Sequence, residues 1–267
     1  MSRNHNVKRY RGLGPFTLAF FIYLYAPLLV VVLYSFNANR ITGVWTEFST
    51  QWYGSALSNT ALMNALETSL LVAVIAMVIS SSIALMASLA IIRGKSVRFR
   101  RLSEVVVNLP LLLPEIVLAV ATLILFSQIG LQNGLVKLII AHSAFCTPFA
   151  FLPIRARLQG MSMDFEEAAA DLYANRWTVF RRVTLPLIFP GLFSGAMLAF
   201  LISMDDFITS NMLASGGTTT LPVYIFSLIR AGTSPELNAI ATLLILGSLV
   251  LATVALTVAN RGLRNER

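Results

Sequence analysis

The stretch Met163–Pro186 reads MDFEEAAADLYANRWTVFRRVTLP and separates two long apolar runs. Its acidic start suits the first turn of a helix, where the helix dipole favours negative charge. Asp164 and Glu167 have the spacing of a capping box, and the alanines that follow propagate a helix well. Asn175 can cap a second short helix that carries three arginines. The sequence therefore predicts a helix–turn–helix that lies outside the hydrocarbon and is contacted by another protein.

The composition around this stretch is that of an integral membrane protein. Of the 267 residues, 57% are hydrophobic and 12% are charged, whereas a soluble domain of this size needs far more polar surface. The net charge of +8 comes from basic residues between apolar runs, which indicates membrane orientation rather than nucleic-acid binding. Cys146 is the single cysteine, so no disulfide forms within the chain.

Six apolar runs are long enough to cross the hydrocarbon core, which takes about 20 helical residues. We therefore predict an all-α membrane protein, a single membrane domain over residues 1–267, with six transmembrane helices. Pro110 and Pro114 are expected to break the third helix, and Pro148 and Pro153 the fourth, through either kinked packing or breaks that line a water-filled path. The predicted spans cover approximately residues 14–36, 65–91, 104–128, 134–156, 187–211 and 237–259.

The basic residues predict the orientation of these helices. If the N-terminus is cytoplasmic, all 20 Lys and Arg residues except Arg40, Lys137 and Arg230 fall in cytoplasmic segments. Such an asymmetry is typical of the cytoplasmic side of a membrane protein. We therefore expect both termini in the cytoplasm. The apolar segment Val223–Ile229 is too short to span and is expected to lie on or dip into the outer face.

The sequence offers little to an enzyme. It has no phosphate-binding loop of the kind that ends in Lys and Ser or Thr, and no Gly-x-Ser-x-Gly or His-Glu-x-x-His motif. Its two histidines are His5 and His142. Cys146 follows His142 by one helical turn, but two ligands are too few for a structural metal site. We therefore expect no metal site, no cofactor and no catalytic residue, and we interpret His142 as a polar contact between packed helices.

Three acids inside predicted spans are the candidates for a solute pathway, because ionisable residues at this depth are costly and often functional. They are Glu115, Asp205 and Asp206. Adjacent helical positions differ by roughly 100°, so one of the two aspartates is expected to line a path and the other to cap or bond the neighbouring loop. Negative side chains along a path predict a cationic solute; carboxylates that only hold helices together are the alternative. Aromatic rings could assist a cation, and the candidates are Phe145, Phe149, Phe207 and Tyr224.

Part of the polar stretch resembles the EAA loop of importer-type ABC permeases. In that family the pattern runs Glu-Ala-Ala, a Gly four positions after the second Ala, then Ile-x-Leu-Pro. The matching residues here are Glu167, Ala168, Ala169, Tyr173 and Val183-Thr184-Leu185-Pro186. Tyr173 replaces a Gly that commonly closes the first short helix with positive φ. A Tyr there costs roughly 1–2 kcal/mol if the left-handed conformation is kept, so either the turn differs or the strain is tolerated.

The resemblance extends to the permease subunits of spermidine/putrescine ABC importers and covers nearly the whole chain. It implies a type I ABC importer permease fold with a transmembrane core at 65–256 and a cytoplasmic EAA-like coupling loop at 158–186. The segments that carry it are YAP at 25–27, SFN at 35–37, PEIV at 114–117, SMDDFI at 203–208, TLPVYIFS at 220–227 and GTSPELNA at 232–239.

The resemblance also implies the partners. They are two ATP-binding subunits that hydrolyse ATP and dock on the coupling loops, a second permease subunit that is usually a different homologous chain, a periplasmic solute-binding protein and the lipid of a bacterial inner membrane. By this resemblance Glu167, Ala168, Ala169, Tyr173, Leu185 and Pro186 couple the permease to the ATPase. A permease for another amine or amino-acid-like solute is one alternative. A stand-alone secondary carrier is another, although paired repeats with broken helices are not evident.

Overall fold

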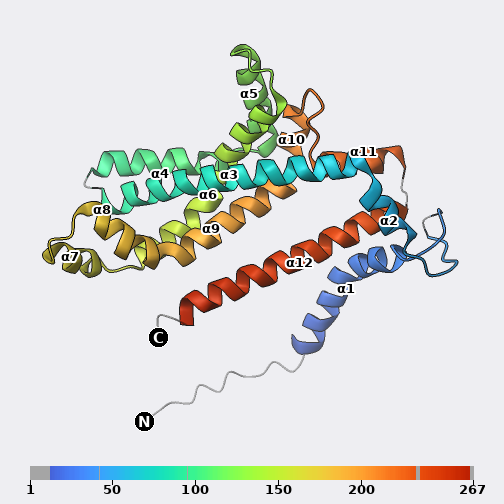
Figure 1. The fold of residues 1–267 in the computed structure, drawn as a ribbon, viewed down its shortest axis with the longest axis horizontal. Coiled ribbons are helices and arrows are strands. Elements are labelled where there is room, and N and C mark those ends of the chain that lie inside the picture. The colour runs from blue at the N-terminus through green and yellow to red at the C-terminus, as the bar shows by residue number, and fades with distance from the viewer. Residues whose placement is uncertain (1–12, 42, 95, 233–234, 265–267) are drawn as a thin grey trace, which may run out of the picture. The chain divides into compact units, whose positions relative to one another are not determined.

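The computed structural model describes residues 13–41, 43–94, 96–232 and 235–264. Within these ranges the chain is helical, and its β-type pairing is one isolated bridge between Asn37 and Phe48. The helices are α1 Leu13–Tyr34, α2 Gln51–Ser58, α3 Thr60–Arg93, α4 Val97–Leu112, α5 Glu115–Gln128, α6 Gly134–Gln159, α7 Asp164–Asp171, α8 Arg176–Val179, the π-helical segment η1 Phe180–Thr184, α9 Leu185–Asp205, α10 Ile208–Leu213, α11 Leu221–Ala231 and α12 Pro235–Arg264 (Figure 1).

Four of these helical stretches are long and apolar enough to cross a membrane. They are α1, α3, α6 and the 30-residue stretch Arg176–Asp205 formed by α8, η1 and α9. The pair of α4 and α5 passes the same test if the two helices are counted as one bent span. The backbone of α12 is helical over 30 residues. Its part Pro235–Val250 counts as a shorter apolar helix. The structure thus shows four or five of the six predicted spans.

The chain divides into two compact units, and the smaller comprises residues 1–58 and 228–248. Asn37 is buried there and organises the segment after α1. Its side-chain amide donates to the Val44 carbonyl at 2.7 Å and accepts from the Thr46 N–H at 3.1 Å, while its own carbonyl accepts from the Trp52 indole at 2.7 Å. These bonds satisfy backbone groups that no regular secondary structure pairs.

The larger unit, residues 59–227 and 249–267, is built on α3, α6 and α9, which pack against one another. Small side chains dominate the contact, as is usual between membrane helices, where close packing supplies the attraction. Its buried cluster consists of Ala84, Ile91, Cys146, Ala150, Phe151, Ile154 and Ala199.

The closest approach between α6 and α9 is at two glycines of α9, Gly191 and Gly195, which form a Gly-x-x-x-Gly pattern. A Cβ atom at position 195 would lie 2.5 Å from the Ala150 carbonyl oxygen. One at position 191 would lie 2.5 Å from Cβ of Arg157 and 3.0 Å from the Pro153 carbonyl oxygen. Only glycine therefore permits this spacing of the two backbones.

Proline breaks one of the two predicted helices and not the other. Leu112 ends α4, and α5 begins after Pro114 with its axis turned by 107°; in Figure 1, α5 stands off from α3, α6 and α9. The residue before a proline disfavours the α conformation, which accounts for the break at this point. The predicted break at Pro114 is confirmed, whereas the predicted break at Pro110 was wrong, because α4 continues through Pro110 to Leu112.

The predicted break of the fourth span was wrong, because α6 runs without interruption through Pro148 and Pro153. Both prolines lie in the part of α6 that packs against α3 and α9, where close neighbours hold the helix together. The predicted fifth span was too long: α9 ends at Asp205, because the backbone of Asp206 is extended (φ −66°, ψ 116°) and α10 is a separate helix.

We predict that Gly195→Ala destabilises the protein by about 1–3 kcal/mol, since the new methyl group forces α6 and α9 apart. The matched control is Gly247→Ala in α12, where a Cβ atom meets nothing within 4 Å and the substitution improves helix propensity. The measurement is thermal unfolding of both variants in detergent micelles. Equal stability of the two variants would contradict the close approach of α6 and α9.

Candidate functional site

The polar loop, residues 158–186, contains α7 and α8. Helix α7 begins at Asp164, so Met163 and not Asp164 occupies the N-cap position, and its side chain makes no capping bond. The Asp164 N–H donates instead to the Ser162 hydroxyl at 3.2 Å. The predicted capping box of Asp164 and Glu167 was therefore wrong: the helix starts one residue earlier than that pairing requires.

The end of α7 is closed at Tyr173, which has φ +61° and is the one non-glycine with positive φ within the described ranges. The Tyr173 N–H donates to the Ala170 carbonyl at 2.9 Å and the Ala174 N–H to the Ala169 carbonyl at 3.2 Å. This pair of bonds is a Schellman motif. Of the two alternatives, the chain therefore keeps the left-handed turn and tolerates a tyrosine in it. The Tyr173 side chain is 99% exposed and that of Leu172 is 82% exposed.

The second helix begins as predicted, because Asn175 Oδ1 accepts a hydrogen bond from the Thr178 N–H at 2.8 Å. It does not remain short. Helix α8 continues through the π-helical segment η1 into α9, so the expected separate second helix was wrong. Leu185 and Pro186 are the first two residues of α9 and follow directly after the π-helical segment.

The polar loop is fixed by a residue that sequence reasoning did not single out. Glu166 binds Arg93 and Thr184, whereas the neighbouring Glu167 is exposed. Of the other predicted coupling residues, Ala168 is exposed and Ala169 is half-buried. The expectation that Glu167 anchors the start of the helix is thus not supported, and its role in coupling stays a prediction.

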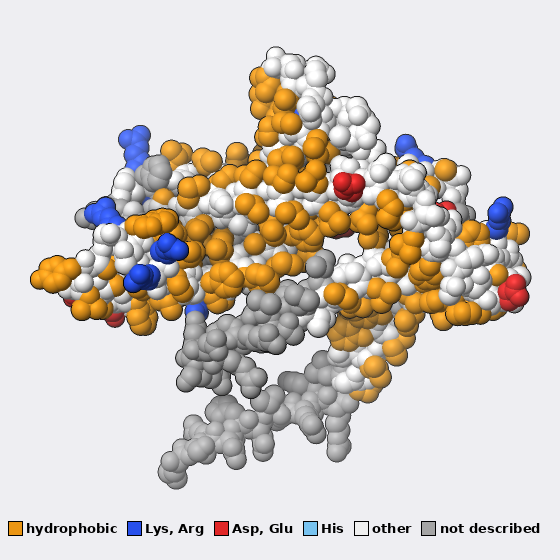
Figure 2. Space-filling view, in the orientation of Figure 1, with side chains coloured by type: hydrophobic (Ala, Val, Ile, Leu, Met, Phe, Trp, Pro, Cys, Tyr) orange, Lys and Arg blue, Asp and Glu red, His pale blue; other side chains and the backbone are white. Residues whose placement is uncertain are grey.

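Further arginines surround the base of the loop, and Figure 2 shows Lys and Arg side chains gathered at the end of the molecule where Figure 1 places α7 and α8. Arg155 forms an ion pair with Glu104 of α4 and lies 5.7 Å from the centre of the Phe151 ring. Arg157 donates to the Leu187 carbonyl at 2.8 Å. These contacts tie α4 and α9 to the end of α6.

Asp206 lies buried at the opposite end of α9. Its carboxylate accepts hydrogen bonds from the Ser210 N–H at 2.8 Å, the Ser210 hydroxyl at 2.9 Å and the Thr209 N–H at 3.3 Å, and so caps α10. His142 Nε2 lies 3.2 Å from the same carboxylate, and His142 Nδ1 lies 2.7 Å from the Ser203 hydroxyl. The expected role of His142 as a polar contact between helices is confirmed, and of the two adjacent aspartates Asp206 is the one that caps the neighbouring segment.

Glu115 and Asp205 lie next to this network at the junction of α5, α9 and α10. Glu115 is half-buried and lies near the carboxyl groups of Asp206 and Asp205. Asp205 is exposed. Among the described residues, neither Glu115 nor Asp205 forms an ion pair with a basic side chain, and no group of three or more His, Cys, Asp or Glu side chains is placed to hold a metal.

The candidate aromatic residues make packing contacts. The Phe149 and Phe145 rings meet edge to face with their centres 5.8 Å apart, and the ring centres of Phe207 and Phe226 are 4.5 Å apart. The Tyr224 hydroxyl accepts a hydrogen bond from the Asn59 side chain at 3.0 Å. The rings are therefore held by neighbours within the larger unit, and a contact with solute stays a prediction.

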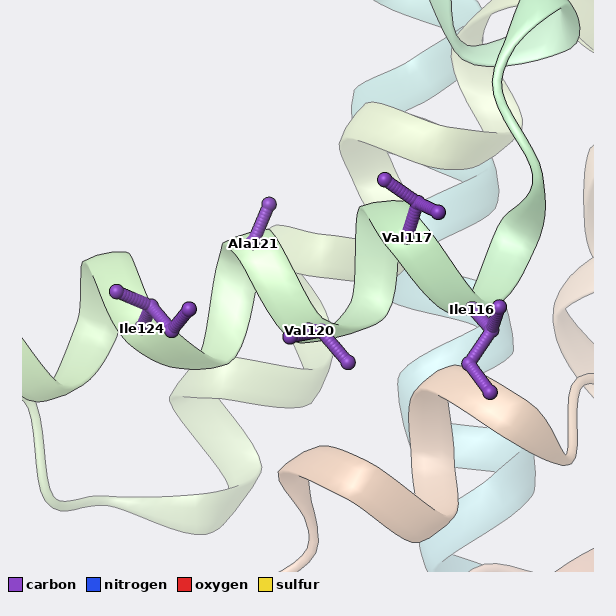
Figure 3. A pocket seen from close by; sticks show the side chains of 5 residues that line it. All are labelled: Ile116, Val117, Val120, Ala121 and Ile124. Atoms are coloured by element: carbon purple, nitrogen blue, oxygen red, sulfur yellow. The ribbon is translucent and has the colours of Figure 1, made fainter.

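An open apolar hollow of about 330 Å³ lies along α5 (Figure 3). Its lining consists of Ile116, Val117, Val120, Ala121 and Ile124, all from this one helix. Because no polar group lines it, the hollow offers nothing to orient a charged solute. Its apolar lining distinguishes it from the acidic junction at Glu115.

The comparison with known proteins agrees with this geometry. Residues 83–264 match the family described as binding-protein-dependent transport system inner membrane component. The chain belongs to this family of permeases. It is therefore an integral inner-membrane protein and a subunit of a transport system.

The permease is similar to two transport proteins of Escherichia coli (strain K12). It is 36% identical over 231 residues to the putrescine transport system permease protein PotI, a match that covers 84% of this chain and 82% of PotI. It is 35% identical over 248 residues to the spermidine/putrescine transport system permease protein PotC, covering 92% of this chain and 93% of PotC. The resemblance to spermidine/putrescine permeases is thereby confirmed.

The fold of the permease is also found among solved structures. A chain of a bacterial ABC transporter involved in the import of the acidic polysaccharide alginate superposes with a TM-score of 0.75, over 96% of this chain and 98% of that one. The sequence identity is 18%, so this likeness concerns the fold. The permease thus has the fold of the transmembrane subunits of ABC importers.

We predict that Asp206→Ala lowers the free energy of unfolding by roughly 3–5 kcal/mol, because it leaves His142 and the start of α10 buried without their partner. In the double variant Asp206→Ala with His142→Ala, the loss of unfolding free energy should be smaller than the sum of the two single losses by about 0.5–3 kcal/mol, because both residues belong to one network. The measurement is unfolding in detergent micelles, with the exposed Asp171→Ala as control. If Asp206→Ala is no less stable than that control, Asp206 is not a structural acid.

Proposed function

We propose that this chain is the permease subunit of an ABC importer for putrescine, spermidine or a related cationic amine, with six transmembrane helices and both termini in the cytoplasm. The observation that carries the solute class is the match over most of the chain to PotC and PotI. The acidic junction supports it, since Glu115 and Asp205 lack a basic partner among the described residues. A dication passing the junction would supply the missing positive charge.

The polar loop is the proposed docking site for the ATP-hydrolysing subunit. Phe165, Leu172, Tyr173 and Trp177 expose large apolar side chains in a segment rich in charge. Such a group of exposed apolar residues with a polar rim is typical of a protein-binding surface. Each of two permease subunits would place α7 on one ATPase subunit, and ATP-driven closure of the ATPase pair would move the loop. A periplasmic binding protein would deliver the solute.

Within this scheme the residues have different roles. The Asp206 carboxylate is bonded to His142, Thr209 and Ser210 and stabilises the junction. Asp205 and Glu115 remain for the solute, and Phe149 and Tyr224 stay candidates for lining its path. Glu167, Ala168 and Tyr173 meet the ATPase, whereas Ala169, Leu185 and Pro186 join the docking helix to the span.

The test of the solute is uptake of labelled putrescine and spermidine by cells with and without this gene, each with and without an energy poison. We expect uptake that needs both the gene and energy. In Asp205→Asn we expect a roughly tenfold lower rate of uptake, equal to about 1.4 kcal/mol for one lost charge. The control is Glu47→Gln, which removes an exposed acid of the smaller unit. Uptake that does not depend on the gene would exclude a polyamine as the solute. Uptake that depends on the gene but survives the energy poison would favour a secondary carrier.

Tyr173 provides a test of the docking surface. Tyr173→Gly removes the ring and the left-handed strain, whereas Tyr173→Ala removes the ring and keeps the strain of roughly 1–2 kcal/mol. If the ring contacts the ATPase, both variants bind the ATPase more weakly by about tenfold, as expected for a buried tyrosine at an interface. The measurement is the affinity of the purified permease pair for the ATPase subunit. Wild-type affinity in both variants would exclude a contact through the ring.

A further inference from the structure

One carboxylate of the polar loop joins three segments of the larger unit. Arg93, the last residue of α3, forms an ion pair with Glu166 of α7: Nη2 donates a hydrogen bond to Oε1 at 3.4 Å, and Nε lies 3.1 Å from Oε2 without the geometry of a hydrogen bond. The Thr184 hydroxyl, in the π-helical segment before α9, donates to Oε1 at 2.9 Å. Both charged side chains are 17% exposed, and Thr184 is buried.

This contact is the specific link between α7 and the spans. Helix α7 has no buried residue of its own and packs on α8 and η1, its neighbours in the chain. The Glu166 carboxylate accepts one hydrogen bond from Arg93 and one from Thr184, and two bonds from different segments fix its direction as well as its distance. Among the described residues, this ion pair is the salt bridge that joins α7 to α3.

The π-helical segment places Thr184 for this role. Arg181 and Arg182 of the same segment are exposed, whereas Thr184 faces inward. π-Helical turns are rare and occur frequently at functional sites, because the wider turn changes which side chains face a neighbour. The start of α9 is thereby bonded to the same carboxylate as the end of α3.

We propose that Arg93, Glu166 and Thr184 are positioning residues that transmit the motion of α7 to α3 and α9 during transport. The inference rests on the proposed function, in which α7 docks on the ATPase. The ATPase pushes or pulls α7, and the Glu166 carboxylate passes this displacement to two of the three helices that form the core of the larger unit. None of the three residues touches the solute or ATP.

The test uses the complete transporter in lipid vesicles and measures the solute imported per ATP hydrolysed. In Glu166→Gln, which keeps the size of the side chain and the acceptor for Thr184, we expect an assembled complex that hydrolyses ATP but imports roughly tenfold less putrescine per ATP, about 1.4 kcal/mol of lost coupling. The matched control is Glu104→Gln, which breaks the ion pair with Arg155 between α4 and α6 and leaves α7 untouched.

Two further variants keep the inference testable if Glu166→Gln assembles poorly. Thr184→Val removes only the hydroxyl bond and should lower import per ATP in a fully assembled complex. The charge exchange Arg93→Glu with Glu166→Arg should restore part of the import that either single change loses. The inference is overturned if Glu166→Gln imports normally, or if Glu104→Gln loses as much coupling. A wild-type permease that does not bind the ATPase would overturn the proposed function itself.

Discussion

The close approach of α6 and α9 at Gly191 and Gly195 is the constraint on which the larger unit depends. In lipid, apolar surfaces gain little from meeting each other, so helices associate where small residues let their backbones come close. Helix α9 begins at the polar loop and ends at Asp205. The same contact therefore holds both the base of the loop and the acidic junction at the opposite end of the helix.

The second constraint is that hydrocarbon offers no partner to a polar group. The buried Asp206 carboxylate finds its partners in His142, Thr209 and Ser210, and these bonds make Asp206 part of the structural core of the junction. Asp205 and Glu115 differ because neither forms an ion pair among the described residues. Two neighbouring aspartates thus differ: Asp206 supports the junction between helices, whereas Asp205 is exposed and is the one that we propose for contact with a cation.

Local sequence rules predicted four or five spans that the structure shows, the break at Pro114 and the cap at Asn175, because each depends on neighbours in the chain. They failed where packing decides: α6 stays continuous through Pro148 and Pro153 because the adjacent helices support it. The link between Arg93 and Glu166 joins residues 73 positions apart, which no local pattern reveals. The Gly-x-x-x-Gly pattern of α9, in contrast, is a local signal that indicates close helix packing.

In the proposed transport cycle, movement of the polar loop reaches the acidic junction along α9. Leu201 lies one helical turn before Asp205 on the same face of α9 and is exposed, while the native Cys146 is buried and gives little background. The direct measurement is the rate at which a membrane-impermeant maleimide labels Leu201→Cys in the assembled transporter, without nucleotide and with a non-hydrolysable ATP analogue. The account predicts different rates in the two states. Identical rates, in a complex shown to bind the analogue, would contradict it.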